Sequence, residues 1–437
     1  MIGFAWGSAA ALALAWPSTA DWWIMATGAV TAASCAVLGA FLVLRRMSMM
    51  GDAISHSVLP GLAAAFLLTR SYSIGPLLAG ALVAGLLTAL LTQTLHRYVR
   101  LPADASMGVV FTSLFALGVV LITQVKGVHF DRQCVFEGAI ELAPLYTISI
   151  AGIEAPRALV VAGVVLAINA AVLLLLWKEM KLSAFDPALS TTMGFPAGLM
   201  HYVLMSLVAL TAVASFEAVG SILVVAMLIV PAATAHLLAD RLGAMVLLSA
   251  GLGAASSVLG FALASHFDTN IAGMMAVAAG GLYGLAALFS PRYGVVSAVI
   301  RNARLALRVI RDDLLGVMYR LEELAVDRRL TSRDAVQAVG GSPLARWGLA
   351  GLIRRRQVLR RGETLELSPE GRAAAQQLVR AHRLWENYLV QYLGLPLDHV
   401  HEPAHRVEHF LDPELQASLE RKLPDATHDP HGRDIPS

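Results

Sequence analysis

The first 290 residues of this 437-residue chain are dominated by long apolar runs separated by short polar connections. A bilayer core offers no water to the backbone, so a chain crosses it as helices or as a closed barrel, and a crossing helix needs about 20 apolar residues. Nine runs meet or approach this length, at 22–44, 54–68, 74–95, 107–125, 158–177, 202–215, 219–238, 242–264 and 271–289. The sequence therefore predicts an all-α polytopic membrane protein with about nine transmembrane helices.

Two of these runs, 54–68 and 202–215, are shorter than a bilayer requires. Short or interrupted hydrophobic segments are typical of transporters. Gly, Ala and Ser are frequent throughout the runs, and small side chains let helix backbones approach closely in lipid. These features favour a closely packed helical bundle of the transporter type.

Charge is distributed unevenly along the chain. It holds 33 basic and 31 acidic side chains, but only 12 of each lie in the first 300 residues. An apolar stretch joined to a highly charged tail predicts two domains, one in lipid and one in water. Basic residues gather at 45–46, 96–100, 178–181, 241 and 292–311, all on one side if the runs alternate. The positive-inside rule then predicts a multi-pass protein of the inner or plasma membrane, with the 126–157 connection outside and the C-terminal domain in the cytoplasm.

Two smaller features leave their alternatives open. Residues 1–21 are apolar but lack a basic region, so a signal peptide and an extra interfacial or spanning segment both fit. Cys35 lies in an apolar run and Cys134 in a polar loop, which excludes a disulfide framework or a cysteine-based zinc site.

Beyond residue 303 the pattern becomes that of a small water-soluble domain. Apolar residues recur at helical spacing with mixed charge between them. Ser368 followed by Pro369 has the N-cap and first-position chemistry of a helix start. The predicted elements are helices over 303–324, 330–342 and 343–356, a hairpin over 357–367, a long helix from 368, and helices around 401–410 and 413–422.

The segment RRMSMMGDAISHSVLPG, residues 45–61, carries the strongest chemical signal of the apolar part. Asp52 and His56 are four residues apart, so a helix presents them on one face. A carboxylate with an imidazole suits Mn²⁺, Zn²⁺ or Fe²⁺, and ionisable groups within spans usually mark ion pathways. Pro60 and Gly61 are predicted to break the helix and free carbonyls near this pair. The alternative is a cap and a polar contact at the lipid–water boundary, close to Arg45.

This segment resembles the signature of the metal-importing ABC permeases, the manganese, zinc and iron type called ABC-3. A second stretch agrees with it, through KEMKLSAFDP at 178–187, Met193-Gly194, Val219-Gly220 and VPAA at 230–233. The resemblance covers about residues 22–290. It implies that Asp52 and His56 contact metal in the translocation path. It also implies that Phe185, Asp186 and Pro187 belong to a cytoplasmic coupling helix that docks on an ATPase.

The sequence contains no Gly-x-x-x-x-Gly-Lys-[Ser/Thr] phosphate loop, so we do not expect this chain to hydrolyse ATP or to be an enzyme. The resemblance implies three protein partners. They are a separate ABC ATPase subunit, an external metal-binding protein, and a second permease copy or a paralogue that completes the pore.

A second group of metal-ligating residue types lies in the tail. His382 and Glu386 are four residues apart, and His401, His405, Glu408 and His409 again fall on one helical face. Six imidazole and carboxylate groups suffice for one or two metal sites. The alternative is a solvated charged face, although a face with so many histidines and so few lysines is unusual.

Residues 312–436 resemble the metal-dependent repressors of the diphtheria toxin repressor and manganese repressor class. The strings that carry the resemblance are MYRLEE at 318–323, LSPEGR at 367–372, HRLWE at 382–386, Leu393-Gly-Leu, Val400-His401, Glu408-His409, DPHG at 429–432 and Ile435-Pro436. The resemblance implies a winged helix-turn-helix and dimerisation helices, with no room for a third, SH3-like domain. It sets ligand positions at Asp313, His382, Glu386, His401, Glu408 and His409.

Two positions depart from the repressor pattern. His405 stands where the family has Cys or Glu, and Gly316 replaces a carboxylate of the manganese-type members. The choice of metal therefore stays open, and a two-manganese site is not implied. The resemblance divides the chain into an N-terminal segment 1–21, a permease domain 22–290, a linker 291–311, a winged helix-turn-helix 312–367 and metal-binding and dimerisation helices 368–437.

The winged helix would use residues 343–356 as its recognition helix and the hairpin as its wing. Arginines there can contact phosphates or guanine edges, or equally an ATPase or anionic lipid headgroups. The candidate DNA contacts are Arg346, Arg354, Arg355, Arg356, Arg360 and Arg361. Most of Leu344, Trp347, Leu349 and Leu352 are expected to be core.

The sequence thus predicts the permease subunit of an ATP-driven importer of a divalent transition metal, with a cytosolic metal-sensing domain. Manganese is favoured, with zinc and iron as alternatives, and rising cytosolic metal is expected to load the tail and slow transport. The alternative is a membrane-tethered, metal-responsive transcriptional regulator that binds DNA. An ATP-independent channel is disfavoured, because a channel has no use for the coupling segment at 185–187.

Overall fold

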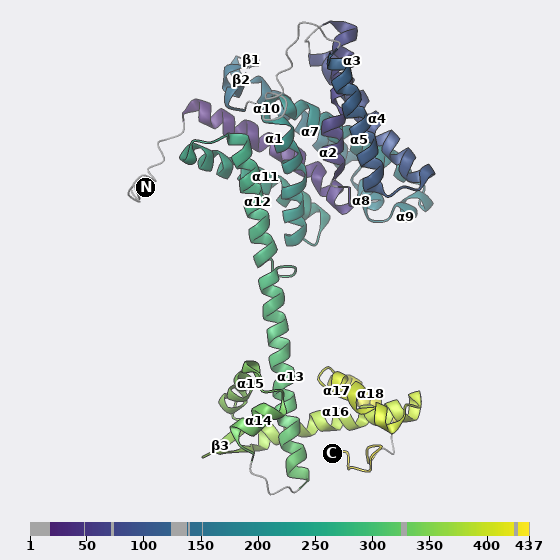
Figure 1. The fold of residues 1–437 in the computed structure, drawn as a ribbon, viewed down its shortest axis with the longest axis vertical. Coiled ribbons are helices and arrows are strands. Elements are labelled where there is room, and N and C mark those ends of the chain that lie inside the picture. Colours follow the sequence, from purple (N-terminus) through teal and green to yellow (C-terminus); the bar gives the residue numbers. More distant parts are fainter. Residues whose placement is uncertain are drawn as a thin grey trace. The chain divides into compact units, whose positions relative to one another are not determined.

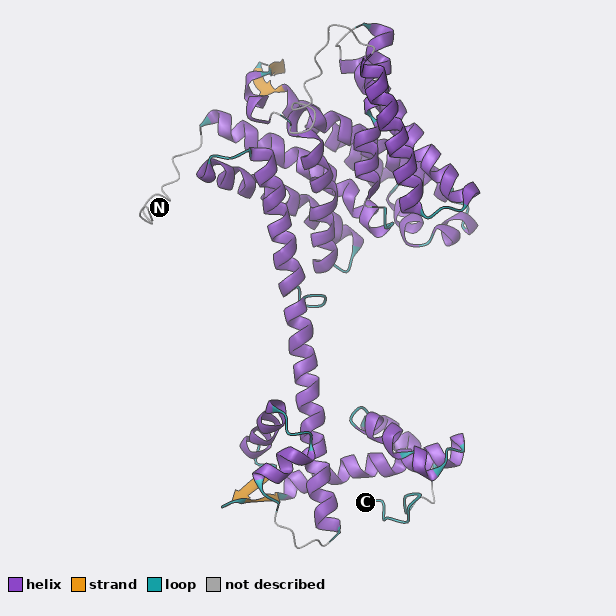
Figure 2. Ribbon diagram, in the orientation of Figure 1, coloured by secondary structure: helices purple, strands orange, loops and turns teal. Residues whose placement is uncertain are grey.

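The structure is a computed structural model of the whole chain and describes residues 18–47, 49–70, 74–123, 138, 140–150, 152–324, 330–423 and 427–436. The chain separates into two compact units, 1–297 and 298–437. Each unit is described by itself below. Both are almost wholly helical, with one small antiparallel hairpin in each (Figure 2). The segment 1–17 and Cys134 lie outside the described residues.

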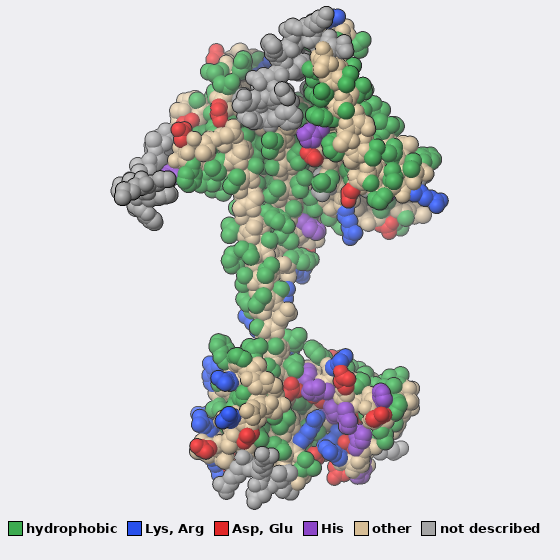
Figure 3. Space-filling model, in the orientation of Figure 1, with side chains coloured by type: hydrophobic (Ala, Val, Ile, Leu, Met, Phe, Trp, Pro, Cys, Tyr) green, Lys and Arg blue, Asp and Glu red, His purple; other side chains and the backbone are tan. Residues whose placement is uncertain are grey.

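Among the described residues, the first unit contains nine helical stretches that are long and apolar enough to cross a membrane, as predicted (Figure 1). Its helices are α1 Thr19–Leu44, α2 Met49–Ser57, α3 Leu59–Thr69, α4 Ile74–Thr94, α5 Ala103–Thr123, α7 Arg157–Leu175, α8 Trp177–Phe185, α9 Pro187–Thr192, α10 Ala197–Leu238, α11 Leu242–Phe267 and α12 Ile271–Phe289. Shorter elements are η1 Leu95–Val99, η2 Ile140–Leu145, and the paired strands β1 Thr147–Ile150 and β2 Ile153–Pro156. The exposed surface of this unit is largely hydrophobic (Figure 3).

The prediction of two short spans was wrong. The first covers 21 residues, Met49–Thr69, and the second covers 20 residues, Ala197–Phe216. The first extends further toward the N-terminus than its apolar run, because the polar turn that contains Asp52 and His56 is helical as well. The second joins the next span within α10 at Gly220, whose φ of 75° and ψ of 164° bend the helix.

The predicted break at Pro60 and Gly61 is present, and it lies just before the proline. The helix is interrupted at Val58, and Pro60 lies in the first turn of the new helix α3. A proline fits there because the first turn of a helix needs no backbone N–H from it. Gly61 instead allows close packing, since a Cβ on it would lie 2.2 Å from the carbonyl oxygen of Gly80 on α4.

The core of the first unit is built around α1 and the second half of α10. Large buried side chains on α1 include Leu38, Phe41 and Leu42. A Cβ on Gly39 would lie 1.7 Å from the carbonyl oxygen of Leu228, so glycine is what lets these two helices approach so closely. The bundle is therefore held by small-residue packing, as expected for helices that associate in lipid.

The second unit is a helix-turn-helix domain followed by a helical region. Its elements are α13 Val295–Glu323, α14 Ser332–Ala338, α15 Pro343–Arg354, β3 Val358–Arg361, β4 Thr364–Leu367, α16 Pro369–Leu393, η3 Leu397–His399, α17 His401–Glu408 and α18 Pro413–Lys422. Ser342 and Ser368 cap α15 and α16 by accepting hydrogen bonds from backbone N–H groups three residues on. β3 and β4 pair as the predicted hairpin, with Val358 opposite Leu367.

Three expectations for this unit need correction. The predicted helix 330–342 is only Ser332–Ala338, because a glycine pair with positive φ follows it. Trp347 is 71% exposed and Leu344 is exposed as well, so only Leu349 and Leu352 of the expected four are core. The predicted helix 303–324 begins earlier, at Val295, so it also runs through most of the predicted 291–311 linker.

Candidate metal sites and the coupling segment

The predicted pair in the membrane unit lies on α2. His56 Nε2 is 3.4 Å from Asp52 Oδ1, and the two side chains are 32% and 40% exposed. The His56 ring faces two aromatic rings of α5, with its centroid 6.0 Å from Phe111 and 5.8 Å from Phe115. The i, i+4 spacing thus gives the shared face that the sequence predicted.

The pair has few possible metal ligands around it in the part of the chain that the structure describes. Among the described residues, it is not joined by a third His, Cys, Asp or Glu ligand atom into a metal-binding group. The neighbouring hydroxyls are already engaged, since Ser55 donates to the Gly51 carbonyl and Ser57 donates to that of Ile54. Two side chains leave most positions around a divalent cation to other ligands.

The predicted coupling segment connects α8 to α9. Asp186 caps α9, because its carboxylate accepts the backbone N–H of Leu189 at 2.9 Å, and Pro187 occupies the first turn. Phe185, Leu189 and Met193 are all exposed and follow one another at intervals of four residues. Phe185 ends α8, Leu189 lies on α9 and Met193 follows it, so the three exposed side chains lie around the short capped helix. Exposed apolar side chains grouped in this way are suited to docking on another protein. The sequence missed Leu189 and Met193, although the spacing from Phe185 was visible.

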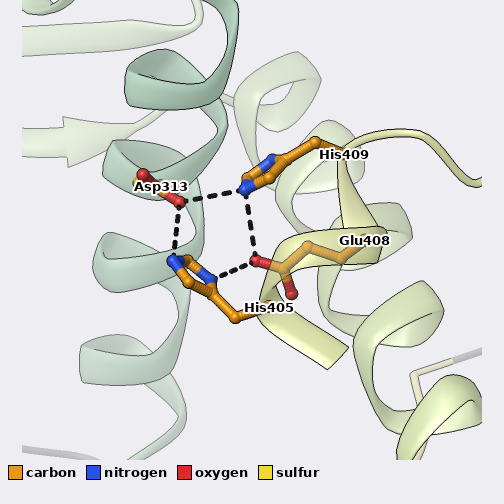
Figure 4. A group of neighbouring side chains, drawn as sticks. All are labelled: Asp313, His405, Glu408 and His409. Atoms are coloured by element: carbon orange, nitrogen blue, oxygen red, sulfur yellow. Dashed lines mark hydrogen bonds and ion pairs between the residues drawn. The ribbon is translucent and has the colours of Figure 1, made fainter. Parts of the chain in front are cut away.

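The tail ligands form two groups rather than one continuous face. The first, the Asp313 cluster, consists of Asp313, His405, Glu408 and His409. His405 Nε2 and His409 Nε2 lie 3.8 and 3.3 Å from Asp313 Oδ1. Glu408 Oε1 lies 2.8 Å from His405 Nδ1 and 3.6 Å from His409 Nε2. Figure 4 shows the four side chains converging from α13 and the C-terminal end of α17.

A pocket of about 300 Å³ adjoins the Asp313 cluster and is lined by Gly316, Asp313, His405 and Glu408. Gly316 lies one helical turn after Asp313 on α13. The carboxylate that the manganese-type pattern has at this position is therefore replaced by open space. Water or an exogenous ligand would have to supply what that carboxylate supplies elsewhere.

The second group, the Glu386 cluster, consists of His382, Glu386 and His401. Glu386 Oε1 lies 3.0 Å from His382 Nε2 and 2.5 Å from His401 Nδ1. His431, which the sequence analysis did not select, stacks on His401 with ring centroids 4.5 Å apart. It lies in the DPHG string, so its residue type was a signal that could have been used.

The atoms of both clusters fit a divalent cation. Four of them, Asp313 Oδ1, His382 Nδ1, Glu408 Oε2 and His409 Nδ1, are buried without a hydrogen-bond partner in the structure. His382 Nδ1 and Glu408 Oε2 are only 2.5 Å apart, yet their geometry is not that of a hydrogen bond. Buried polar atoms without partners are costly, and a cation that ligates them removes this cost.

Electrostatics within the clusters shifts several pKa values. Burial alone lowers the pKa of His409, but the carboxylates of Asp312 and Asp313 outweigh it and raise this pKa to about 9. Burial likewise opposes protonation of His382, whose pKa is nevertheless raised by the nearby carboxylates of Glu386 and Glu408. Without metal, the raised pKa values favour a proton on His382 and on His409. These protons must leave before the two side chains can bind a metal ion.

The predicted DNA-contacting arginines are all exposed, on α15, on the turn after it and on the hairpin. Two of them have local partners. Arg361 Nε lies 3.1 Å from Glu366 Oε2, and Arg360 Nε donates to the Gly362 carbonyl at 3.1 Å. These two wing arginines would have to exchange those contacts for phosphate.

Comparison with known proteins agrees with both parts of this architecture. A profile of the ABC 3 transport family matches residues 21–290, and a profile of the iron dependent repressor metal binding and dimerisation domain matches residues 368–437. The manganese transport system membrane protein MntD of Bacillus subtilis is 45% identical over 282 residues, which are 64% of this chain and 95% of that protein. The zinc transport system membrane protein TroD of Treponema pallidum is 38% identical over 357 residues, 79% of this chain and 95% of that protein.

Among solved structures, PsaBC from Streptococcus pneumoniae in complex with Fab matches with a TM-score of 0.54 and 31% identity. The match covers 63% of this chain and 94% of that chain. The chain belongs to the ABC 3 transport family of multi-pass membrane permeases and carries a C-terminal metal binding and dimerisation domain of the iron dependent repressor type.

Proposed function

We propose that this protein is the membrane subunit of an ATP-driven importer of a divalent transition metal, with Mn²⁺ favoured over Zn²⁺ and Fe²⁺. The observation that carries the proposal is the Asp52–His56 pair on α2 of an ABC 3 permease. Relatives named for manganese and for zinc transport support the substrate class. The mixed carboxylate and imidazole donors suit all three ions, so the donors alone do not select one.

The pair provides two ligand side chains, which is too few to hold a six-coordinate or a four-coordinate ion alone. A second permease copy, or a paralogue, would supply further ligands across a shared pore. An external metal-binding protein would deliver the ion from outside. Partial exposure of Asp52 and His56 in the isolated chain is consistent with a surface that a partner permease covers.

Energy would come from a separate ATPase that docks on α9. The exposed apolar side chains of Phe185, Leu189 and Met193 around α9 support this docking surface. Arg45, at the C-terminal end of α1, donates a 2.6 Å hydrogen bond to Ser183 of α8. Since α2 begins four residues after Arg45, this contact offers a direct route from the docking segment to the helix of the metal pair.

Uptake of ⁵⁴Mn²⁺ and ⁶⁵Zn²⁺ into vesicles that contain the permease and its ATPase tests the transport proposal. We expect ATP-dependent uptake of one metal, lost in Asp52→Ala/His56→Ala. The matched control is Asp268→Ala/His266→Ala, which removes the same residue types from exposed positions at the end of α11. Uptake of neither metal by the folded complex, or equal loss in both double variants, would contradict the proposal.

We also propose that the tail lies in the cytoplasm and senses the transported metal through the Asp313 and Glu386 clusters. A bound cation would replace the protons on the histidines of the clusters. Its ligands would come from α13, α16 and α17, so the cation would link these helices. Feedback requires two transport states that differ in metal affinity. High internal Mn²⁺ should slow uptake by the intact chain but not by His382→Ala/His409→Ala. Equal rates at low and high internal metal in both proteins would rule feedback out.

A second candidate function is DNA binding by the helix-turn-helix. The observation that favours it is the full exposure of the arginine set on α15 and the hairpin. Gel shifts of the intact solubilised chain on DNA from upstream of its own gene, with and without Mn²⁺, test this function. A metal-dependent, sequence-specific shift that Arg346→Ala/Arg354→Ala abolishes would support it.

A further inference from the structure

The first half of α13 is strongly basic and contains no acidic residue. Between Val295 and Arg311 the helix carries four arginines, Arg301, Arg304, Arg308 and Arg311, before the first acidic residue at 312. At about 100° per residue, these four positions fall within an arc of about 80°. The helix therefore presents one continuous basic stripe along its first half.

This stripe borders a defined pocket in the second unit. The pocket has a volume of about 390 Å³ and is lined by Arg304, Arg308 and Arg311 of α13 and by Arg355, just after α15. We call these four residues the arginine pocket. Asp312 is the one acidic side chain that lines it, and it lies 3.4 Å from His409 on the side of the Asp313 cluster. Four guanidinium groups around one space favour an anion.

Arg311 is held in place by α15, and one of its donor atoms has no hydrogen-bond partner. Arg311 lies against α15, where a Cβ on Gly351 would come within 2.9 Å of its guanidinium. Its Nε is buried and has no hydrogen-bond partner in the structure. Arg311 is therefore fixed between α15 and the pocket, which holds its positive charge at the pocket wall.

The sequence next to the pocket indicates where that acceptor comes from. α13 begins six residues after α12 ends at Phe289, and α12 is the last of the spans. The first turns of α13 expose Val295, Val299 and Ile300 to their surroundings. An apolar segment followed directly by arginines, close to the end of a transmembrane helix, is the pattern of a helix that binds anionic headgroups.

We propose that the arginine pocket binds the phosphate of an anionic phospholipid of the leaflet that the basic loops face. The guanidinium groups of Arg304, Arg308 and Arg311 donate to the phosphate oxygens. The site is distinct from both metal clusters. None of the residues of the Asp313 and Glu386 clusters lines the pocket.

The test uses the full chain, delipidated in mild detergent and then offered phosphatidylglycerol or phosphatidylcholine with identical acyl chains. Native mass spectrometry measures retention of each lipid. The pocket variant is Arg304→Gln/Arg308→Gln. The matched control is Arg346→Gln/Arg354→Gln, which removes two exposed arginines outside the pocket. Arg304→Lys/Arg308→Lys changes the same two positions but keeps their charge, so it shows whether lost lipid retention comes from lost charge or from misfolding.

We expect the intact chain to prefer phosphatidylglycerol and the pocket variant to lose about thirtyfold of that preference, since each surface arginine contributes roughly a factor of five. The control and the lysine variant should keep most of it. Equal retention of the two lipids by the intact chain would overturn the proposal, as would equal losses in the pocket variant and the control.

Complete displacement of lipid by an equal concentration of inorganic phosphate would assign the pocket to a free anion. Loss of duplex DNA binding in the pocket variant with unchanged lipid retention would assign it to nucleic acid. Either of these two results also overturns the proposal.

Discussion

Glu408 is the residue that joins the two metal clusters of the tail. One carboxylate oxygen lies 2.8 Å from His405 Nδ1 in the Asp313 cluster, and the other lies 2.5 Å from His382 Nδ1 of the Glu386 cluster. The side chain is only 2% exposed. We therefore predict that Glu408→Gln, which keeps the shape and removes the charge, weakens metal binding at both clusters at once.

The size of the effect follows from the role of Glu408 in each cluster. In the Asp313 cluster it is one of two carboxylates among the four side chains that would ligate a cation, so the substitution halves the negative charge and removes one of these ligands. In the Glu386 cluster it only contacts the ligand His382, and loss of such an outer partner typically costs 10–100-fold in affinity. We expect about a hundredfold or greater loss at the first cluster and roughly tenfold at the second.

Calorimetric titration of the intact solubilised chain with Mn²⁺ measures both affinities. The control is Glu402→Gln on the same helix, because Glu402 is exposed, pairs with Arg406 and belongs to neither cluster. An unchanged second affinity beside a weakened first one would refute the bridging role. Equal losses in Glu402→Gln and Glu408→Gln would show that the charge of α17 matters rather than the contacts of Glu408.

Three further predictions concern other parts of the chain. The pKa of His409 is raised to about 9 in the metal-free protein, so its stabilising effect is complete below the ordinary value of 6.5 and is lost as pH rises through 9. The hydrogen-exchange protection factors of α17, which remove the intrinsic rise of the exchange rate with pH, should therefore fall across that window without metal, while Mn²⁺ affinity should rise with pH; protection factors and affinity that both stay constant would contradict this pKa. Gly39→Ala should destabilise the membrane unit by at least about 3 kcal/mol, because the new Cβ meets backbone. Thermal melting in detergent measures this, and Gly251→Ala, where a Cβ meets nothing within 4 Å, should melt close to the unchanged protein. Phe185→Ser should lower ATP-dependent uptake at least about tenfold by weakening the ATPase dock. Leu145→Ser, an equally exposed apolar position on η2, should leave uptake unchanged, and equal uptake by both variants would remove Phe185 from the dock.

The spans were predictable because apolar length is a direct requirement of the bilayer. Their ends were less so, since the polar turn around Asp52 continues the helix even though it contributes no hydropathy. The sequence suggested that Pro60 would end a helix, but a proline also starts one, and nothing local distinguishes these two uses. In the structure, α2 ends just before the interruption at Val58, and Pro60 then lies in the first turn of α3.

The ligand residue types of the tail were predictable, but their grouping was not. Helical spacing gave His401, His405 and His409 a common face without indicating what each residue on that face meets. His401 reaches Glu386 on α16, whereas His409 reaches Asp313 on α13. A single short helix thus serves two clusters because its two ends contact different helices. Trp347 was mispredicted for a related reason, as an apolar residue type does not reveal which face of α15 is covered.

The arrangement on α13 separates the roles of the two clusters. Arg311 lies against Gly351 of α15, and Asp313 Oδ1 lies 3.3 Å from His409, so adjacent residues of one turn contact the helix-turn-helix and the metal-bearing helix. A change of charge at the Asp313 cluster therefore acts directly on α13, the helix that follows the last span. The Glu386 cluster is built from α16 and α17 alone and reaches the other cluster through Glu408. If the tail regulates transport, the Asp313 cluster is the one that includes a residue of α13, and the Glu386 cluster acts by fixing the position of α17.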